Sequence, residues 1–106
     1  MTVLGALQEV RNRISKPEHW AKGTMARDKD NDPVCCPRSR RAAQWSICGA
    51  INYAIDSVET ERHIKKVLVA HLPSQFKAID LFNDHPRTTH QDVLDLLDRA
   101  IEVEKQ

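Results

Sequence analysis

The sequence predicts a mostly α fold, a compact bundle of about five helices with a small β-hairpin between the first and second helices. Two observations predict it. Apolar residues recur at helical spacing in several separate segments, and turn-forming Gly, Pro, Asp and Asn separate those segments. The length of 106 residues, with no long linker or repeat, indicates that residues 1–106 form a single helical domain.

The first helix is predicted from Val3 to Ile14, where apolar residues recur at helical intervals. Thr2 precedes this run and can serve as its N-cap. Pro17 ends the helix or lies just beyond its end, because proline cannot continue a helix from within.

Residues 18–37 have no helical period. The charged run at residues 28–32, followed by proline, is typical of a turn. We therefore expect residues 24–27 and 33–35 to form the two short strands of a hairpin. An isolated hairpin is only marginally stable, so it should lean on the helices, with Trp20 as its anchor.

The second helix is predicted from Ser39, as its cap, to about Ile55. Its apolar residues cover most of its circumference, which is typical of a central, buried helix. Gly49 in its middle disfavours helix by about 1 kcal/mol relative to alanine. The close approach of another backbone would explain why a glycine stands there.

Three further helices complete the predicted bundle. One spans residues 59–72, a short one includes residues 76–82, and the last buries apolar residues between 93 and 101. Thr88 and Gln91 match a capping box at the start of the last helix.

Charge and cysteine content limit the class of protein. Sixteen Lys and Arg against 15 Asp and Glu give a net charge of +1, which does not favour a general nucleic-acid or membrane binder. Neither a signal peptide nor a run of about 20 apolar residues is expected. Cys35, Cys36 and Cys48 are odd in number and form no disulfide framework, so we expect a reducing, cytoplasmic location.

Several short motifs follow one another in a specific order. They are His19-Trp20-x-Lys22-Gly23, Ala42-x-x-Trp45-x-x-Cys48-Gly49-Ala50, Phe82-Asn83-Asp84-x-Pro86-x-Thr88 and Val93-Leu94-x-Leu96-Leu97. Together they resemble an uncharacterised family of short bacterial and phage proteins, a domain of unknown function. The pattern departs from the family at Phe82, where Trp is usual. The resemblance implies a fold, and a virion component if a phage encodes the chain, but it transfers no mechanism.

The polar junction between the last two helices, residues 82–90, has two interpretations. As structure, it holds a turn, a helix-blocking proline and a helix cap, supplied by Asn83, Asp84, Pro86 and Thr88. As function, Asp84, His85 and His90 could form an acid–base group or a weak metal site, with Arg87 binding an anion. The structural interpretation is favoured, but it leaves His85, Arg87 and His90 unexplained.

Metal sites are not expected. Asp28, Asp30 and Asp32 resemble the start of a calcium loop, but Pro33 and Ser39 stand where an EF-hand needs Gly and Glu. The three cysteines, with His63 or His71, contain no Cys-x-x-Cys pair of the kind that structural zinc uses. No cofactor is predicted, although Cys35 or Cys36 could be a reactive thiol.

Arg38, Arg40 and Arg41 precede the apolar part of the predicted second helix. Cations at a helix start oppose the helix dipole, so their placement indicates a partner. We therefore predict a small interaction or regulatory module, in preference to an enzyme, that binds another protein or itself. Its partner-binding candidates are Arg38, Arg40, Arg41, Trp20 and Arg87. The alternatives are a small-ligand or enzyme site at Asp84, His85 and His90, and weak nucleic-acid binding through the three arginines.

Overall fold

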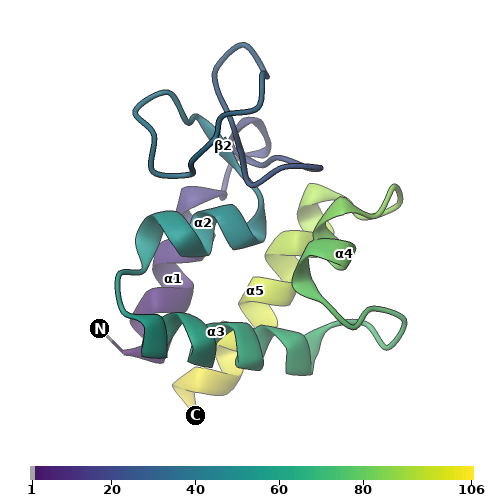
Figure 1. Ribbon diagram of the computed structural model, residues 1–106. Coiled ribbons are helices and arrows are strands. Elements are labelled where there is room, and N and C mark those ends of the chain that lie inside the picture. Colours follow the sequence, from purple (N-terminus) through teal and green to yellow (C-terminus); the bar gives the residue numbers. More distant parts are fainter. Residues whose placement is uncertain (1) are drawn as a thin grey trace.

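The computed structural model describes residues 2–106, and this part of the chain contains five α-helices and one two-stranded antiparallel sheet (Figure 1). This architecture confirms the predicted mostly α class. In chain order the elements are α1 (Val3–Arg13), a 3₁₀ turn (Pro17–His19), β1 (Ala26–Arg27), β2 (Gln44–Trp45), α2 (Ile47–Ala54), α3 (Val58–His71), α4 (Ile79–Asp84) and α5 (His90–Lys105).

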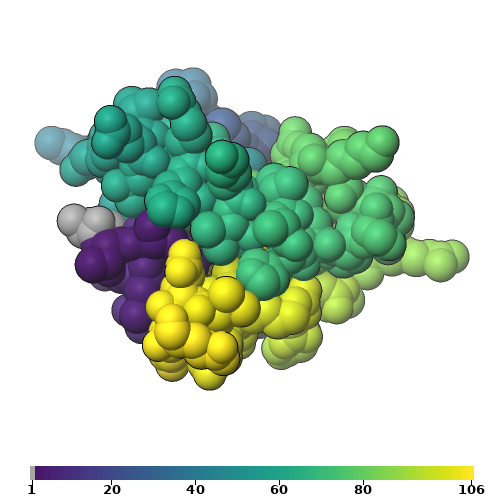
Figure 2. Space-filling view, turned by 90° about the horizontal axis from the view of Figure 1, so that it is seen from below, coloured from purple at the N-terminus to yellow at the C-terminus, as the bar shows by residue number. Residues whose placement is uncertain are grey.

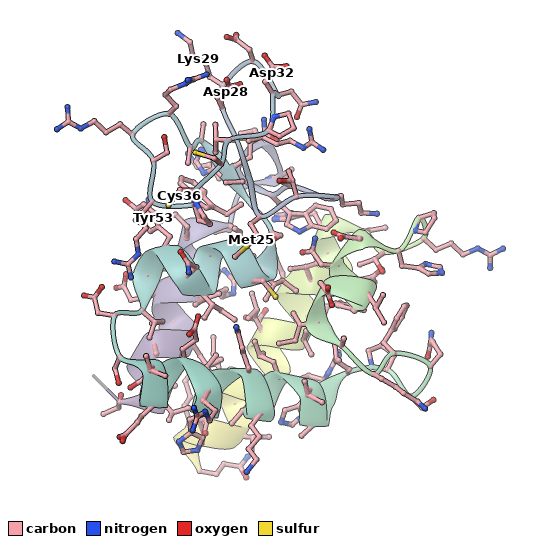
Figure 3. All side chains as sticks on the ribbon, viewed as in Figure 1. Met25, Asp28, Lys29, Asp32, Cys36 and Tyr53 are labelled. Atoms are coloured by element: carbon pink, nitrogen blue, oxygen red, sulfur yellow. The ribbon has the colours of Figure 1, made fainter. Side chains whose placement is uncertain are left out.

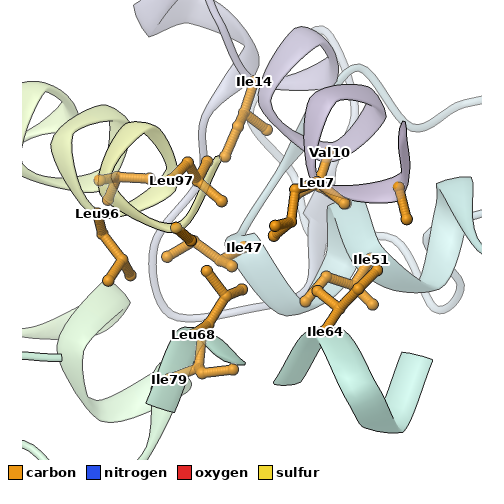
Figure 4. Close-up of a cluster of buried hydrophobic side chains, with 14 of the residues drawn as sticks. Leu7, Val10, Ile14, Ile47, Ile51, Ile64, Leu68, Ile79, Leu96 and Leu97 are labelled. Carbon is orange, nitrogen blue, oxygen red and sulfur yellow. The ribbon is translucent and has the colours of Figure 1, made fainter. Parts of the chain in front are cut away.

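The helices share one hydrophobic core. Helix α1 packs against α5, α2 and α3, while α3 also packs against α5 and α2 against α4. Figure 2 shows α1, α3 and α5 meeting on one face of the molecule. The largest fully buried apolar side chains come from α1, α2, α3 and α5, with Ile14 just after α1; they are Leu7, Val10, Ile14, Ile47, Ile51, Ile64, Leu68, Val93, Leu96 and Leu97 (Figure 4).

Hydroxyl side chains begin four of the helices. The prediction for α1 is confirmed, since the Thr2 hydroxyl accepts a hydrogen bond from the Gly5 amide at 2.9 Å. The capping box of α5 is one residue later than predicted and consists of Thr89 and Asp92. Thr88 is buried instead, and its backbone amide donates to the carbonyl of His85, which closes the preceding turn.

The predicted start of α2 at Ser39 is wrong, because α2 begins at Ile47 with Ser46 as its cap. The preceding residues are extended: Ala26 pairs with Trp45 in the antiparallel sheet. The amides of Ala43 and Ser46 donate to carbonyls 16 and 21 residues earlier in the chain. This distant strand partner overrides the helical period of the local sequence.

Residues 15–46 form what we call the loop lobe, which lies at one end of the helices beside α2 (Figure 1). The first predicted strand is confirmed by β1, but its main partner is β2. The second predicted strand, residues 33–35, contributes only an isolated bridge from Pro33 to Arg27 and a hydrogen bond from the Val34 amide to the Ala26 carbonyl.

At Gly49 the backbone of the loop lobe lies directly against the backbone of α2. A Cβ atom added there would lie 1.8 Å from the carbonyl oxygen of Met25 and 2.8 Å from its carbonyl carbon. Met25 lies directly above α2 in Figure 3. The expected close approach of another backbone is therefore confirmed, and only glycine leaves room for it.

Asp28 organises the acidic turn at the tip of the loop lobe, where Figure 3 shows it with Lys29 and Asp32. One carboxylate oxygen accepts hydrogen bonds from the amides of Asp30 and Asp32, at 2.9 and 3.0 Å. Arg41 approaches the other oxygen at 3.7 Å. The amide of Asp32 foremost, then that of Asp30 and the charge of Arg41, lower the pKa of Asp28, although burial acts against them.

We expect this turn to make the free energy of unfolding depend on pH in the acid range. Because the folded pKa of Asp28 is lowered, its contribution is present above the unfolded pKa of about 3.9 and is lost as pH falls through the folded pKa. Urea unfolding between pH 2 and 6 should therefore show a shallower acid slope for Asp28→Asn than for the wild type. An identical slope would mean that another carboxylate carries the effect.

Candidate functional site

The centre of the polar junction is Asn83, whose side chain is completely buried. Its amide oxygen accepts hydrogen bonds from the indole N–H of Trp20 at 2.8 Å and from the backbone amide of Ile47 at 3.1 Å. Its amide nitrogen donates to the carbonyl of Ala21 at 3.0 Å and to Asp84 at 2.9 Å. The predicted turn role of Asn83 is wrong, since this residue joins α4 to the loop lobe and to the start of α2.

Asp84 and His90, two of the three candidate catalytic residues, also hold the loop lobe and its connections. The Asp84 carboxylate accepts from the backbone amide of Gly23 at 2.9 Å. His90 Nε2 lies 2.7 Å from the carbonyl oxygen of Ile14, and its ring packs against Trp20 with 5.8 Å between centroids. Both side chains therefore already have partners within the fold.

His85, the third candidate, has a different environment. Its Nδ1 accepts a hydrogen bond from the Arg87 amide at 3.1 Å, and its ring meets Phe76 edge-on at 5.3 Å. A concave pocket of about 500 Å³ lies beside it, which we call the junction pocket; its lining includes Phe76, Phe82, His85, Arg87, Asp95 and Arg99. Asp84 and His90 do not line this pocket, so the structure does not bring the three candidates together there.

The aromatic residues serve mainly as packing groups. Trp45 and Phe82 are buried, and Trp20, Tyr53 and Phe76 pack partly buried against the core. The indole N–H groups of Trp20 and Trp45 donate to Asn83 and to the carbonyl of Pro37. Trp20 is a predicted partner-binding residue, but its indole N–H is already hydrogen-bonded to Asn83. Only part of its ring remains accessible to a partner.

The three arginines of the loop lobe differ in what they contact. The prediction that they stand at the start of α2 is wrong, because α2 begins later. Arg38 lies at the opposite end of that helix and donates to the carbonyls of Asn52 and Ile55, at 2.9 and 3.0 Å. It also pairs with Asp56. A cation there satisfies carbonyls that the helix end leaves unpaired, so Arg38 has a structural use.

Replacing Arg38 should therefore destabilise the protein. We expect Arg38→Ala to lower the free energy of unfolding by about 1 kcal/mol, a value reduced by the partial exposure of this side chain. Arg40→Ala is the matched control and should change it by less than about 0.5 kcal/mol. Urea unfolding of both variants checks this, and equal stabilities would contradict a capping role for Arg38.

A concave surface of about 450 Å³ on the loop lobe, which we call the basic hollow, is lined by Lys29, Arg40 and Arg41 and also by Asp28 and Asp30. Both arginines are exposed. Within residues 2–106 the Arg40 guanidinium has no hydrogen-bond or ion-pair partner, and Arg41 has only its pairing with Asp28. A second hollow of about 410 Å³, lined partly by Arg13 and Trp45, shares Lys29 with the first.

The cysteines are all free thiols: Cys35 and Cys36 are exposed and Cys48 is half-buried in α2. Burial raises the pKa of the Cys48 thiol, as expected for a side chain in the core. In the part of the chain that the structure describes, no three His, Cys, Asp or Glu residues gather as a metal-binding group. Among the same residues, no helix is long and apolar enough to cross a membrane.

These features define a small helical fold with a strand-paired loop lobe. Hydrogen bonds of the buried Asn83 side chain connect this lobe to α4 and to the start of α2. The chain belongs to the family of unknown function DUF6197, whose family model matches residues 1–103. Neither the curated proteins nor the solved structures contain a significant match to the chain.

Proposed function

We propose that this protein is a small interaction module that acts by binding an acidic segment of another protein through the loop lobe. The observation that carries the proposal is the basic hollow, a concave surface in whose lining the three cations Lys29, Arg40 and Arg41 outnumber the two carboxylates of Asp28 and Asp30. Unlike Arg38, Arg40 is not used to hold the fold, so its charge is available to a partner.

The charge of the loop lobe favours an acidic partner. Residues 15–46 contain seven Lys or Arg and four Asp or Glu, whereas the whole chain is nearly neutral. Asp28, the most buried of the four acids, already accepts two amide hydrogen bonds within its own turn. Guanidinium groups bind carboxylates through paired hydrogen bonds, which suits Arg40 and Arg41 to Asp and Glu side chains.

The extent of the surface favours a polypeptide over a small molecule. The basic hollow and the second hollow share Lys29 and Ala43 in their linings, so they adjoin each other. A stretch of chain could lie across both, with Arg13 and Trp45 at the far end. For a phage or mobile-element protein in the cytoplasm, such a surface suits a regulator or inhibitor of a host protein.

Nucleic-acid binding through the same arginines is the competing hypothesis. Phosphate contacts would make affinity fall steeply with salt, by about one power of ten in affinity per power of ten in salt for each contact. The cations of the loop lobe are interspersed with four acidic residues, and the lobe has no exposed aromatic row for stacking bases, so we favour a protein partner.

The test is capture of a partner from lysate of the native host by tagged protein, followed by mass spectrometry. The double variant Arg40→Glu/Arg41→Gln should lose a stoichiometric partner while keeping its melting temperature within about 4 °C of the wild type. Arg38 is left unchanged because its loss would destabilise α2.

The matched control is Arg62→Glu/Lys66→Gln, which makes the same change in net charge on exposed positions of α3. This control should keep the partner. Equal loss from both double variants would show that net charge, and not the basic hollow, governs capture. Recovery of nucleic acid in place of a protein, released by moderate salt, would support the competing hypothesis.

A further inference from the structure

The junction pocket is a second concave site, separate from the basic hollow, and the fold leaves its charged groups largely unused. Arg87 comes from the turn between α4 and α5, and Arg99 comes from the third turn of α5. Both side chains are exposed, and neither guanidinium has a hydrogen-bond or ion-pair partner among residues 2–106. The pocket thus offers two cations to a ligand.

The turn supplies further donors. Because His85 Nδ1 accepts the amide hydrogen of Arg87, the ring proton of the neutral imidazole belongs on Nε2. Nε2–H is then the ring donor of His85, a residue that lines the pocket. Thr88 also lines the pocket, and the hydrogen bond that closes this turn uses its backbone amide and not its hydroxyl.

Helix α5 supplies the opposite charge. Asp92 and Asp95 lie one turn apart on the face of α5 that lines the pocket. One oxygen of each carboxylate is occupied, by the amide of Thr89 and by the side chain of Gln91 respectively. The second oxygen of each carboxylate remains available as an acceptor.

The pocket also has an apolar surface. Phe76 and Phe82 pack edge-on at 5.4 Å, and Phe76 meets the ring of His85 at 5.3 Å. Phe76 is only partly buried, so its ring can cover an apolar group of a ligand. The volume of about 500 Å³ lies within the range of small-molecule sites.

We propose that the junction pocket binds a zwitterion of amino-acid size with an apolar side chain. Its carboxylate binds Arg87 and Arg99, its ammonium group binds Asp95, and its side chain packs on Phe76. A ligand with only one charge would leave either the guanidinium groups or the carboxylate of the pocket unmatched, and mismatched polar groups lower affinity.

The probe for this site is L-phenylalanine, titrated into ¹⁵N-labelled protein and followed by NMR. We expect saturable shifts of amides in residues 73–99, with a dissociation constant of about 1 mM or below. Two analogues are compared with it: 3-phenylpropionate lacks the ammonium group and 2-phenylethylamine lacks the carboxylate. Each should bind at least about tenfold more weakly, as expected for one lost charge-assisted interaction.

Substitutions of the charged pocket residues test which of them binds the carboxylate of the ligand and which binds its ammonium group. Arg87→Ala and Arg99→Ala should each weaken phenylalanine by about tenfold. Asp95→Asn should weaken phenylalanine but leave 3-phenylpropionate unchanged. All three positions are exposed, and the same spectra report whether each variant is folded. Arg40→Glu/Arg41→Gln should bind phenylalanine normally, which separates this site from the basic hollow.

Two results would overturn the proposal. Absence of saturable shifts in residues 73–99 would show that the pocket does not bind the probe. Equal binding of 3-phenylpropionate and phenylalanine would show that the acidic side of the pocket takes no part, and the site would then be one for simple carboxylates.

Discussion

Gly49→Ala is expected to be among the most destabilising single substitutions in this protein, lowering the free energy of unfolding by about 3 kcal/mol or more. The added Cβ would lie 1.8 Å from the carbonyl oxygen of Met25. The obstacle is backbone, so no side-chain rotation relieves it. Either the loop lobe must move away from α2, or α2 must shift in the core.

Whether Gly49→Ala lowers or raises the free energy of unfolding shows whether packing or helix propensity dominates at this position. Alanine in place of a glycine within a helix should otherwise stabilise by about 1 kcal/mol. Asn52→Ala on the same helix is the control and should be neutral or slightly stabilising. Chemical or thermal unfolding measures both variants, and a Gly49→Ala protein as stable as the wild type would mean that the loop lobe does not rest on α2 at Met25.

Asn83→Ala should lower the free energy of unfolding by about 4 kcal/mol. The substitution removes four hydrogen bonds and leaves the indole N–H of Trp20, the amide of Ile47 and the carbonyl of Ala21 without their partner. Buried polar groups left unpaired cost about 1–3 kcal/mol each, and partial access of water reduces the sum.

Asn83→Asp provides a sharper version of the same experiment. It keeps the shape of the side chain but replaces the donor that faces Ala21 and Asp84 with a carboxylate oxygen. A buried charge beside a second carboxylate is costly, so this variant should be much less stable at pH 7 than at pH 4. Leu81→Ala, on the exposed side of α4, is the control and should change the stability little.

Near-wild-type stability of Asn83→Ala would contradict the conclusion that the hydrogen bonds of Asn83 hold the loop lobe against α4.

The helices could be predicted from the sequence because their causes are local. Apolar residues at helical spacing mark α1, α3 and α5, and hydroxyl residues before them supply the caps. The start of α2 could not be predicted in this way. Trp45 fits a helical apolar pattern, but the backbone of its segment pairs with residues about twenty positions earlier, and no local pattern contains that partner.

The role of Asn83 had a signal in the sequence that turn propensity obscured. Ile79, Phe82 and Asn83 stand at helical spacing i, i+3 and i+4, so the asparagine lies on the buried face of α4. A polar residue on such a face must have hydrogen-bond partners. Which partners it has, Trp20 and Ile47 among them, depends on the path of the loop lobe and could not be read from spacing.

The candidate binding residues were predictable as residue types but not as a surface. Three neighbouring arginines look equivalent in the sequence, yet Arg38 caps α2 while Arg40 and Arg41 line the basic hollow. The junction histidines separate in the same way, since His90 contacts Ile14 and His85 lines the junction pocket. These differences arise from tertiary contacts that the sequence does not display.

Hydrogen–deuterium exchange of the captured complex, compared with the free protein, tests the proposed protein-binding surface most directly. If the partner binds the basic hollow, amides within residues 28–45 should exchange more slowly in the complex, while those of residues 73–99 should be unchanged. Slower exchange confined to residues 73–99, with none in the loop lobe, would contradict the proposed surface and place the partner at the junction pocket.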